Sequence, residues 1–515
     1  MPISTPAAGR SLARASSLMA VLLLLSKGMG FLREVAVANS YGAGLVKDAN
    51  TIAYILPALF LILLGGLNGP FHLSTMRAVT SLRTEGREDE VPGVLLTIFA
   101  GTAAITGGLA LVAYLAASWI VRITGPGLSP EGHALAVTNL HIMSPLIMIG
   151  GLIGVLCGIS NARDKFTNSS LTPMVSSLAV IGVVLWTSAP TAIAWGTLVG
   201  AVGQLALQAI PVFQDWQEIT GGRAVRPVPM SHPAFVDMLR MLVPAGLSSS
   251  VGTLNVAIAS AFCSSLPEGS ISAFNYSNQL IQLPLGILLT ALLVPMFPRL
   301  TEAATSGDRK SLFAWLNRGV QSIALVLMPI SALAIVLGEA AIRLVFQHGH
   351  FSADDTRKTA TVLTIVALSM VAYGTRDLFT RVFYAQNKSR VPLLVTSVSI
   401  GTTLLFNALL IRFQIAGLAW ATTLVTIGNL ILLGFFLRRD LGTLGLGPSV
   451  STLVKALAAS AIAAGLAYFA KGLVPFSGQL GALVQLVGVG TLGLAAYMAV
   501  LMALRVPALD LLRRR

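Results

Sequence analysis

Long apolar runs separated by short polar breaks are the feature that most limits how this chain can fold. Runs of about 20 apolar residues, each long enough to cross a hydrocarbon core of about 30 Å, recur along the whole sequence. They predict membrane-spanning helices, because lipid leaves helices or closed barrels as the only options and barrel strands would alternate at every second residue. Only 10% of the residues are charged, against roughly 25% in soluble domains. The chain is therefore predicted to be an all-α polytopic membrane protein.

About fourteen spans are expected from the lengths of these runs. The first run continues into further apolar residues without a small-residue cleavage site, so we interpret it as a span and not as a signal peptide. The spans are placed near 15–40, 50–70, 93–120, 137–160, 171–190, 192–213, 235–262, 272–297, 314–337, 359–381, 391–411, 415–437, 451–470 and 480–504.

The positive charges predict the orientation of the spans. The formal net charge is +14. With a cytoplasmic N-terminus, most Lys and Arg residues fall in cytoplasmic segments, as the positive-inside rule requires. Both termini are then cytoplasmic, and the basic residues are interpreted as topology signals and not as nucleic-acid contacts. Few basic residues fall on the opposite side: Lys47, Arg122, Arg343, Arg357, Lys358, Arg412 and Lys471.

Two local patterns occur twice and indicate an internal duplication. "DANTIAYILP" (48–57) resembles "SAFNYSNQLIQLP" (272–284), and "GISNARDKFTNSSLTPMV" (158–175) resembles "RVFYAQNKSRVPLLV" (381–395). Ala49 and Ala273 are 224 residues apart (273 − 49). Chance similarity of helix-ending turns is the alternative interpretation.

The duplication predicts the domain organisation. Six spans in each copy is an even number, so both copies start on the same side of the membrane, as in transporters built from parallel repeats. We expect an N-terminal six-helix lobe at 1–232, a second six-helix lobe at 233–448, and two additional helices with a basic cytoplasmic tail at 449–515.

Charged residues at the end of the first apolar run are the first candidates for function. The run continues into "SKGMGFLREVAVANSYGAG" (26–44), which holds Lys27, Arg33 and Glu34. A cation at mid-bilayer costs at least about 2.5–3.5 kcal/mol, so it faces protein or water and marks a functional site by default. The alternative is that Arg33 and Glu34 mark the external end of the span and that only Lys27 is deep.

A polar stripe and a second charged pair are further candidates. Four amide residues at i, i+3, i+4 and i+7 share one helix face, which suits a water-filled cavity. The alternative is that they hydrogen-bond between spans. Arg376 adds a cation within the tenth span, with Asp377 as its expected partner. The stripe consists of Asn275, Asn278, Gln279 and Gln282.

Catalytic and metal-binding motifs are not found in the sequence. Cys157 and Cys263 form no CxxC pair, and no Ser/His/Asp set or paired carboxylates have a spacing that suggests hydrolysis. We therefore expect a protein that is not an enzyme and that uses no cofactor or metal.

Three motifs resemble the MurJ/MviN lipid II flippases of the MOP exporter superfamily: "GFLREVAVANSYGAGLVKDANTIAYILP" (30–57), "FQHGHFSADD" (346–355) and "FYAQNKSRVP" (383–392). The resemblance implies fourteen helices, two six-helix lobes in a V-shaped arrangement around a central cavity, and a groove for the lipid tail at the last two helices. It implies a monomer of the bacterial cytoplasmic (inner) membrane, active in cell-wall biogenesis and cell shape. Its substrate would be the undecaprenyl-diphosphate-linked peptidoglycan precursor, which alternating access moves from the inner to the outer leaflet.

The resemblance also assigns site residues. Lys27 stands where the family usually has an arginine, and Arg33 and Asp48 match family residues directly. The family's second-span arginine pair falls on Leu61 and Ile62, and its eighth-span arginine falls on Gln279. The expected cavity is therefore less cationic than in other members, and sodium coupling is not supported.

Two other transport functions stay open at this point. One is a flippase for another lipid-linked oligosaccharide, which the missing arginines favour slightly. The other is a MATE-like exporter of small organic cations, which would need acidic cavity residues where this sequence has few. A membrane scaffold without transport is the third class.

Overall fold

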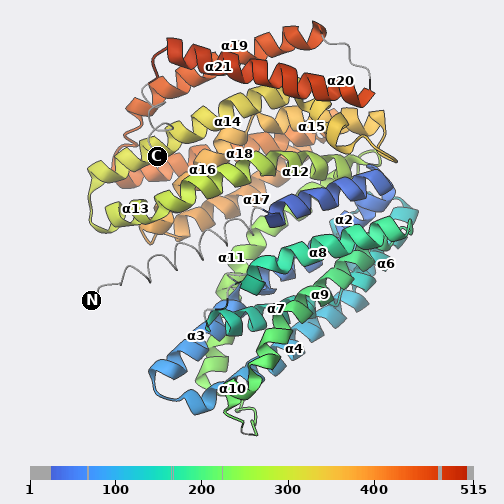
Figure 1. The fold of residues 1–515 in the computed structure, drawn as a ribbon, viewed down its shortest axis with the longest axis vertical. Helices are drawn as coiled ribbons and strands as arrows, with labels where there is room; N and C mark the ends of the chain where they lie inside the picture. The colour runs from blue at the N-terminus through green and yellow to red at the C-terminus, as the bar shows by residue number, and fades with distance from the viewer. Residues whose placement is uncertain are drawn as a thin grey trace. The chain divides into compact units, whose positions relative to one another are not determined.

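The computed structural model describes residues 25–65, 69–163, 165, 167–222, 224–473 and 478–506, and these residues form helices and connecting turns without a β-strand (Figure 1). The beginning of the first predicted span and the predicted basic tail lie outside these ranges. The chain divides into two compact units. Unit 1 comprises Met1–Tyr41 and Leu45–Ala261, and unit 2 comprises Gly42–Gly44 and Phe262–Arg515.

The first described helix of unit 1 covers residues 25–41. Several of its helices start at a proline, where the missing N–H needs no partner: Pro70, Pro92 and Pro130 each lie in a first turn. The further helices are α2 (Leu45–Gly65), α3 (Pro70–Thr84), α4 (Val91–Leu115), α5 (Ala117–Thr124), α6 (Pro130–Met143), α7 (Leu146–Asn161), α8 (Thr167–Trp186), α9 (Ala192–Gln214), α10 (Trp216–Thr220) and most of α11 (Pro233–Ser264).

Unit 2 has the same kind of helical architecture. In Figure 1 its last long helices, α19 and α21, lie side by side, and α19 also packs on α14. The helices are α12 (Ser270–Leu288), α13 (Val294–Thr305), α14 (Arg309–Phe346), α15 (Ala353–Ala367), α16 (Met370–Ala385), α17 (Arg390–Leu410), α18 (Gln414–Leu441), α19 (Gly447–Leu473), α20 (Gly478–Val484) and α21 (Gly490–Ala503).

Many of these helices can span a membrane. Within the described ranges, eight stretches are long and apolar enough, and a ninth arises if α15 and α16, which are bent by 49° at their junction, form one span. The all-α polytopic prediction is confirmed, whereas the number fourteen stays a prediction. The longest stretch, Arg390–Leu441, contains both α17 and α18.

The order and packing of the helices confirm the internal duplication. Leu146 starts α7 and Met370 starts α16, which is a spacing of 224 residues (370 − 146). The packing partners recur as well: α2 packs on α6 as α12 packs on α15, α3 on α7 as α13 on α16, and α8 on α9 as α17 on α18. The two copies therefore share the same helical arrangement, although most of α11, which begins the second copy, lies in unit 1.

Small residues allow close helix packing inside unit 1. A Cβ added at Gly196 or Gly200 of α9 would lie 2.8 Å from the Cα atom of Val180 or Ser176 of α8. The two glycines are four residues apart and so face the same neighbour, the small-xxx-small pattern that membrane helices use for backbone contact. The packing of α8 on α9 thus depends on glycine at both positions.

One helix boundary differs from the prediction in a way that concerns function. The second helix starts at Leu45 instead of near residue 50, so Lys47 and Asp48 belong to its first turn and not to a loop. A carboxylate at this position is favoured by the helix dipole. Both residues are buried, with exposed fractions of 6% and 4%.

Candidate functional site

Unit 1 holds a buried cluster of three charged residues, Arg33, Glu34 and Lys47, which we call the ion triad. One oxygen of the Glu34 carboxylate, Oε1, accepts from Arg33 Nη2 at 2.8 Å and from Arg33 Nε at 3.3 Å. The other oxygen, Oε2, accepts from Lys47 Nζ at 2.8 Å. The carboxylate is therefore shared between two cations, and the triad carries one net positive charge.

The three side chains of the ion triad differ in how far they are buried. The side chains of Glu34 and Lys47 are only 11% and 8% exposed, whereas that of Arg33 is 32% exposed. Desolvating charges is expensive, and a buried ion pair often stabilises a fold no better than apolar residues of similar volume. Arg33 is thus the member of the triad that an incoming group can reach most easily, while Glu34 and Lys47 are enclosed.

The local chain path explains the triad. Arg33 and Glu34 lie on the helix of residues 25–41, and the chain then turns before α2 begins at Leu45. This places Lys47, in the first turn of α2, against Glu34 although the two are 13 positions apart. Asp48 follows directly and is buried beside this turn.

Lys27 lies on the same helix as Arg33, but its residue is exposed. Among the described residues, no ion pair or hydrogen bond involves Lys27, and its Nζ does not join the triad. The structure therefore brings together Arg33, Glu34 and Lys47 and leaves Lys27 apart from them.

The predicted amide stripe lies on α12 of unit 2. Asn278 and Gln282 are exposed, while Asn275 and Gln279 are half-buried. The Asn275 amide donates to the carbonyl of Ile271 on its own helix at 3.0 Å. The opposite face of α12 is buried through Tyr276, Ser277, Ile281 and Leu285.

Arg376 of α16 differs from the prediction in its partner. Its guanidinium lies 4.2 Å from the centre of the Tyr373 ring, a cation–π contact. Asp377 pairs instead with Arg381, at 3.0 Å between Oδ2 and Nε. The expected pairing of Arg376 with Asp377 is therefore wrong, because Arg381 is one helical turn further on and shares a face with Asp377.

The second helix shows what replaces one missing arginine. Leu61 packs into the bundle of unit 1, since a Cβ added at Gly150 of α7 would lie 2.9 Å from its Cδ2 atom. The side chain of Ile62 lies outside the described part of the structure. An apolar residue at position 61 thus fits a helix contact and not a polar cavity.

The sequence interpretation missed Lys47 as a site residue and counted it as a loop cation. The signal that could have identified it is the repeat, because the residues 224 positions after Lys47 and Asp48 are Ile271 and Ser272. In the second copy the position of Lys47 is occupied by the buried Ile271, which is 1% exposed. Folding alone therefore does not require a charge at this position.

Comparison with known proteins gives consistent matches. The family model described as "Lipid II flippase MurJ" matches residues 37–488. The probable lipid II flippase MurJ of Synechocystis sp. is 32% identical over 470 residues, which cover 88% of this chain and 86% of that protein.

Solved structures share the fold. A lipid II flippase MurJ in an inward closed conformation matches with a TM-score of 0.77 at 21% identity, over 94% of this chain and 97% of that one. An inward-facing MATE family transporter of the MOP superfamily matches with a TM-score of 0.68 at 12% identity, over 81% of this chain and 95% of that one. The apolar helices and these relatives indicate a multi-pass protein of the bacterial inner membrane. The chain belongs to the MurJ family of lipid II flippases.

Proposed function

We propose that this protein is a flippase that moves lipid II, the undecaprenyl-diphosphate-linked peptidoglycan precursor, from the inner to the outer leaflet by alternating access. The observation that carries the proposal is the family match over residues 37–488. The protein acts as a transporter and not as an enzyme. It works as a monomer, with two six-helix lobes at 1–232 and 233–448 and two additional helices at 449–515.

The diphosphate of the substrate is held by the ion triad. A diphosphate carries about two negative charges, and desolvating it within the membrane is prohibitive without cations. Arg33 offers a planar fork of donors that suits phosphate oxygens, and Lys47 offers a compact charge. Both already contact Glu34, which keeps the two cations close together in the absence of substrate.

The remaining predicted residues have supporting roles. Asp48 stabilises the first turn of α2 beside Lys47. Lys27 adds a second, exposed cation on the first helix. The amide stripe and Arg376 of unit 2 bind the sugar part of the headgroup: Asn275, Asn278, Gln279, Gln282 and Arg376.

A MATE-like exporter of organic cations is disfavoured by the same geometry. Such an exporter needs a carboxylate that is available to a cationic substrate. Glu34 is buried, but its two oxygens accept from Arg33 and Lys47. The similarity to the MATE transporter supports a shared fold and no shared substrate.

Complementation tests the function. We expect the native protein to restore growth and lipid II exposure at the outer surface in a bacterium depleted of its own flippase. Arg33→Ala should abolish the rescue while the protein accumulates normally, and Lys27→Arg should be tolerated. Normal accumulation of the native protein without rescue would refute the function, and full rescue by Arg33→Ala would place the diphosphate elsewhere.

Both termini are cytoplasmic in this proposal, and the start of α15 is external. A cysteine introduced at Ser352, in a protein whose two native cysteines are replaced, should react with an impermeant thiol reagent in intact cells. Labelling that requires lysis would reverse the orientation.

A further inference from the structure

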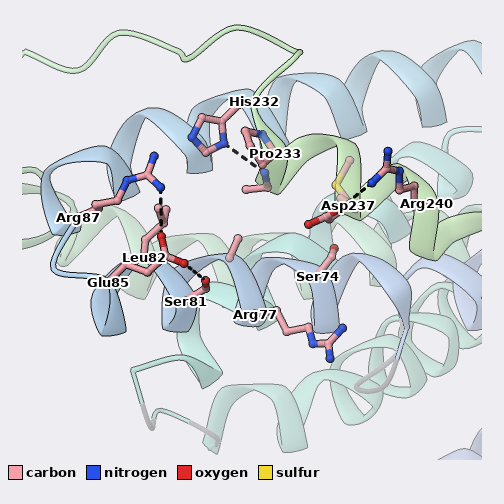
Figure 2. Close-up of a pocket in the computed structure, with 13 residues that line it drawn as sticks. Ser74, Arg77, Ser81, Leu82, Glu85, Arg87, His232, Pro233, Asp237 and Arg240 are labelled. Atoms are coloured by element: carbon pink, nitrogen blue, oxygen red, sulfur yellow. Dashed lines mark hydrogen bonds and ion pairs between the residues drawn. The ribbon is translucent and has the colours of Figure 1, made fainter.

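A pocket in unit 1, lined by both apolar and charged residues, lies apart from the ion triad. It has a volume of about 750 Å³, which is within the range of about 300–1,000 Å³ that is typical of ligand sites. Helix α3, the turn that follows it and the first residues of α11 form its walls (Figure 2). These segments belong to the predicted cytoplasmic end of unit 1.

The wall formed by α11 is firmly anchored. The hydroxyl of Thr97 on α4 donates to the carbonyl of Val228 at 2.7 Å. Further on, Phe235 fills the space beside Gly101, where an added Cβ would lie 2.3 Å from the Phe235 ring. The segment that enters α11 is therefore fixed to α4, and the pocket is a preformed feature of the unit.

The pocket carries one guanidinium–carboxylate pair at each end (Figure 2). At one end, Arg87 Nη1 lies 3.1 Å from Glu85 Oε2. At the other end, Arg240 Nη1 lies 3.5 Å from Asp237 Oδ1. Ser81 lies between them on α3 and donates to Glu85. Both signs of charge are thus present at both ends.

Ion pairs of this kind are easily exchanged for a ligand. The side chains of Arg240 and Asp237 are 77% and 67% exposed, and the pair is longer than a usual charge-assisted hydrogen bond. Exposed pairs contribute little to stability, so a ligand that brings its own charges can replace one partner at low cost.

The arrangement discriminates between parts of the proposed substrate. A purely anionic group such as a diphosphate would be attracted by the arginines of the lining but would also meet Glu85 and Asp237, whose like charge repels it and which it leaves unused. The arginines are Arg77, Arg87 and Arg240. An uncharged sugar makes no use of the paired charges. A peptide that carries both an ammonium group and carboxylates finds partners of each sign at both ends.

We propose that this pocket receives the peptide part of the lipid-linked headgroup on the cytoplasmic side, before the diphosphate enters the ion triad. The ammonium group is received by Asp237 or Glu85, and the carboxylates by Arg240. This inference rests on the proposed function, because it assigns a second contact to the same substrate.

Transport by the purified protein in vesicles tests the pocket with two substrates: lipid II, and the same lipid after enzymatic removal of its peptide. The variant combines Asp237→Asn with Arg240→Gln. We expect the rate for lipid II at low concentration to fall about tenfold, as for one lost charge-assisted contact. The rate for the lipid without peptide should change less than twofold.

A matched control is available on α13. Arg299 and Glu302 form an exposed pair with the same 3.5 Å distance and i,i+3 spacing, but outside the pocket. Replacing both by Gln should affect neither substrate. Equal losses for both substrates in the pocket variant, or no loss for lipid II, would overturn the inference. If the native protein moves neither lipid, the proposed function itself fails.

Discussion

The two six-helix repeats share one ion pair, whereas the ion triad is found in the first repeat only. In unit 1, Lys165 Nζ lies 2.5 Å from Asp215 Oδ2 and ties the turn between α7 and α8 to the end of α9. In unit 2, Lys388 pairs with Asp440 and ties the turn between α16 and α17 to the last residues of α18. We call these two pairs the turn pairs.

The ion triad has no equivalent in the second repeat. The residues 224 positions after Arg33, Glu34 and Lys47 are Ala257, Ile258 and Ile271. An apolar combination is thus compatible with the same helical arrangement.

This difference separates structural charges from functional ones. A pair that recurs at the same turn in both repeats serves the fold that both repeats share. A buried triad found in one repeat costs desolvation that the other repeat avoids. The simplest reason to keep it is a task that only the first repeat performs, and binding an anionic group is a task that suits a net positive cluster.

The largest effect is expected from removing the shared carboxylate. Glu34→Ala leaves the buried Lys47 and the partly buried Arg33 without their common partner, which should destabilise the protein by about 3–5 kcal/mol. Thermal unfolding of the purified protein in detergent measures this. An unfolding midpoint equal to the native one would mean that Glu34 does not hold the two cations.

Converting the first repeat into the second sharpens the comparison. The triple variant Arg33→Ala, Glu34→Ile and Lys47→Ile should be within about 1 kcal/mol of the native stability, because apolar residues replace a buried ion cluster at little net cost. The same unfolding measurement applies. If the triple variant is as unstable as Glu34→Ala, the triad is structural and the two repeats differ in packing.

A smaller effect is expected at Lys47 alone. Lys47→Arg keeps the charge and the donor to Glu34, and should retain most of the transport. Lys47→Met keeps the length and loses the charge, and should lower the transport of lipid II about tenfold through the loss of one positive charge from the triad. Equal rates for both variants would exclude Lys47 from the anion site.

The smallest effect is expected at the turn pairs. The hydrogen bond from Lys165, with the nearby charge of Arg163, lowers the pKa of Asp215 below its usual value. The pair therefore contributes its full stabilisation at pH values above the ordinary Asp pKa of about 3.9. This stabilisation is lost as the pH falls through the lower pKa that Asp215 has in the folded protein. Hydrogen exchange of the amides in the turn between α7 and α8, corrected for intrinsic rates, should show protection that persists to about pH 4 and decreases below it.

Lys165→Gln and Lys388→Gln provide the matched comparison. Each should increase exchange in its own turn only and leave transport unchanged. A large loss of transport from either variant would show that the turn pairs do more than hold the turns.

The helices and the duplication could be predicted because they depend on local patterns. Apolar runs report directly on membrane burial, and matching turn sequences recur near residues 162 and 385. The partner of Asp377 could also have been predicted, since Arg381 is four residues away on the same helix face.

The ion triad and the pocket depend on tertiary contacts that no local pattern encodes. Lys47 reaches Glu34 only because the turn after residue 41 reverses the chain, and α2 starts earlier than its apolar run suggests. The pocket exists because Phe235 fits beside Gly101 and fixes the start of α11 on α4. Such contacts between distant segments require the folded structure.

The central claim is that the ion triad is kept for binding an anionic lipid headgroup and not for folding. The most direct measurement is the rate at which purified native protein and the folded triple variant move lipid II across vesicle membranes. The account predicts transport by the native protein and none by the variant, although both unfold at similar temperatures. Transport at the native rate by the triple variant would contradict it.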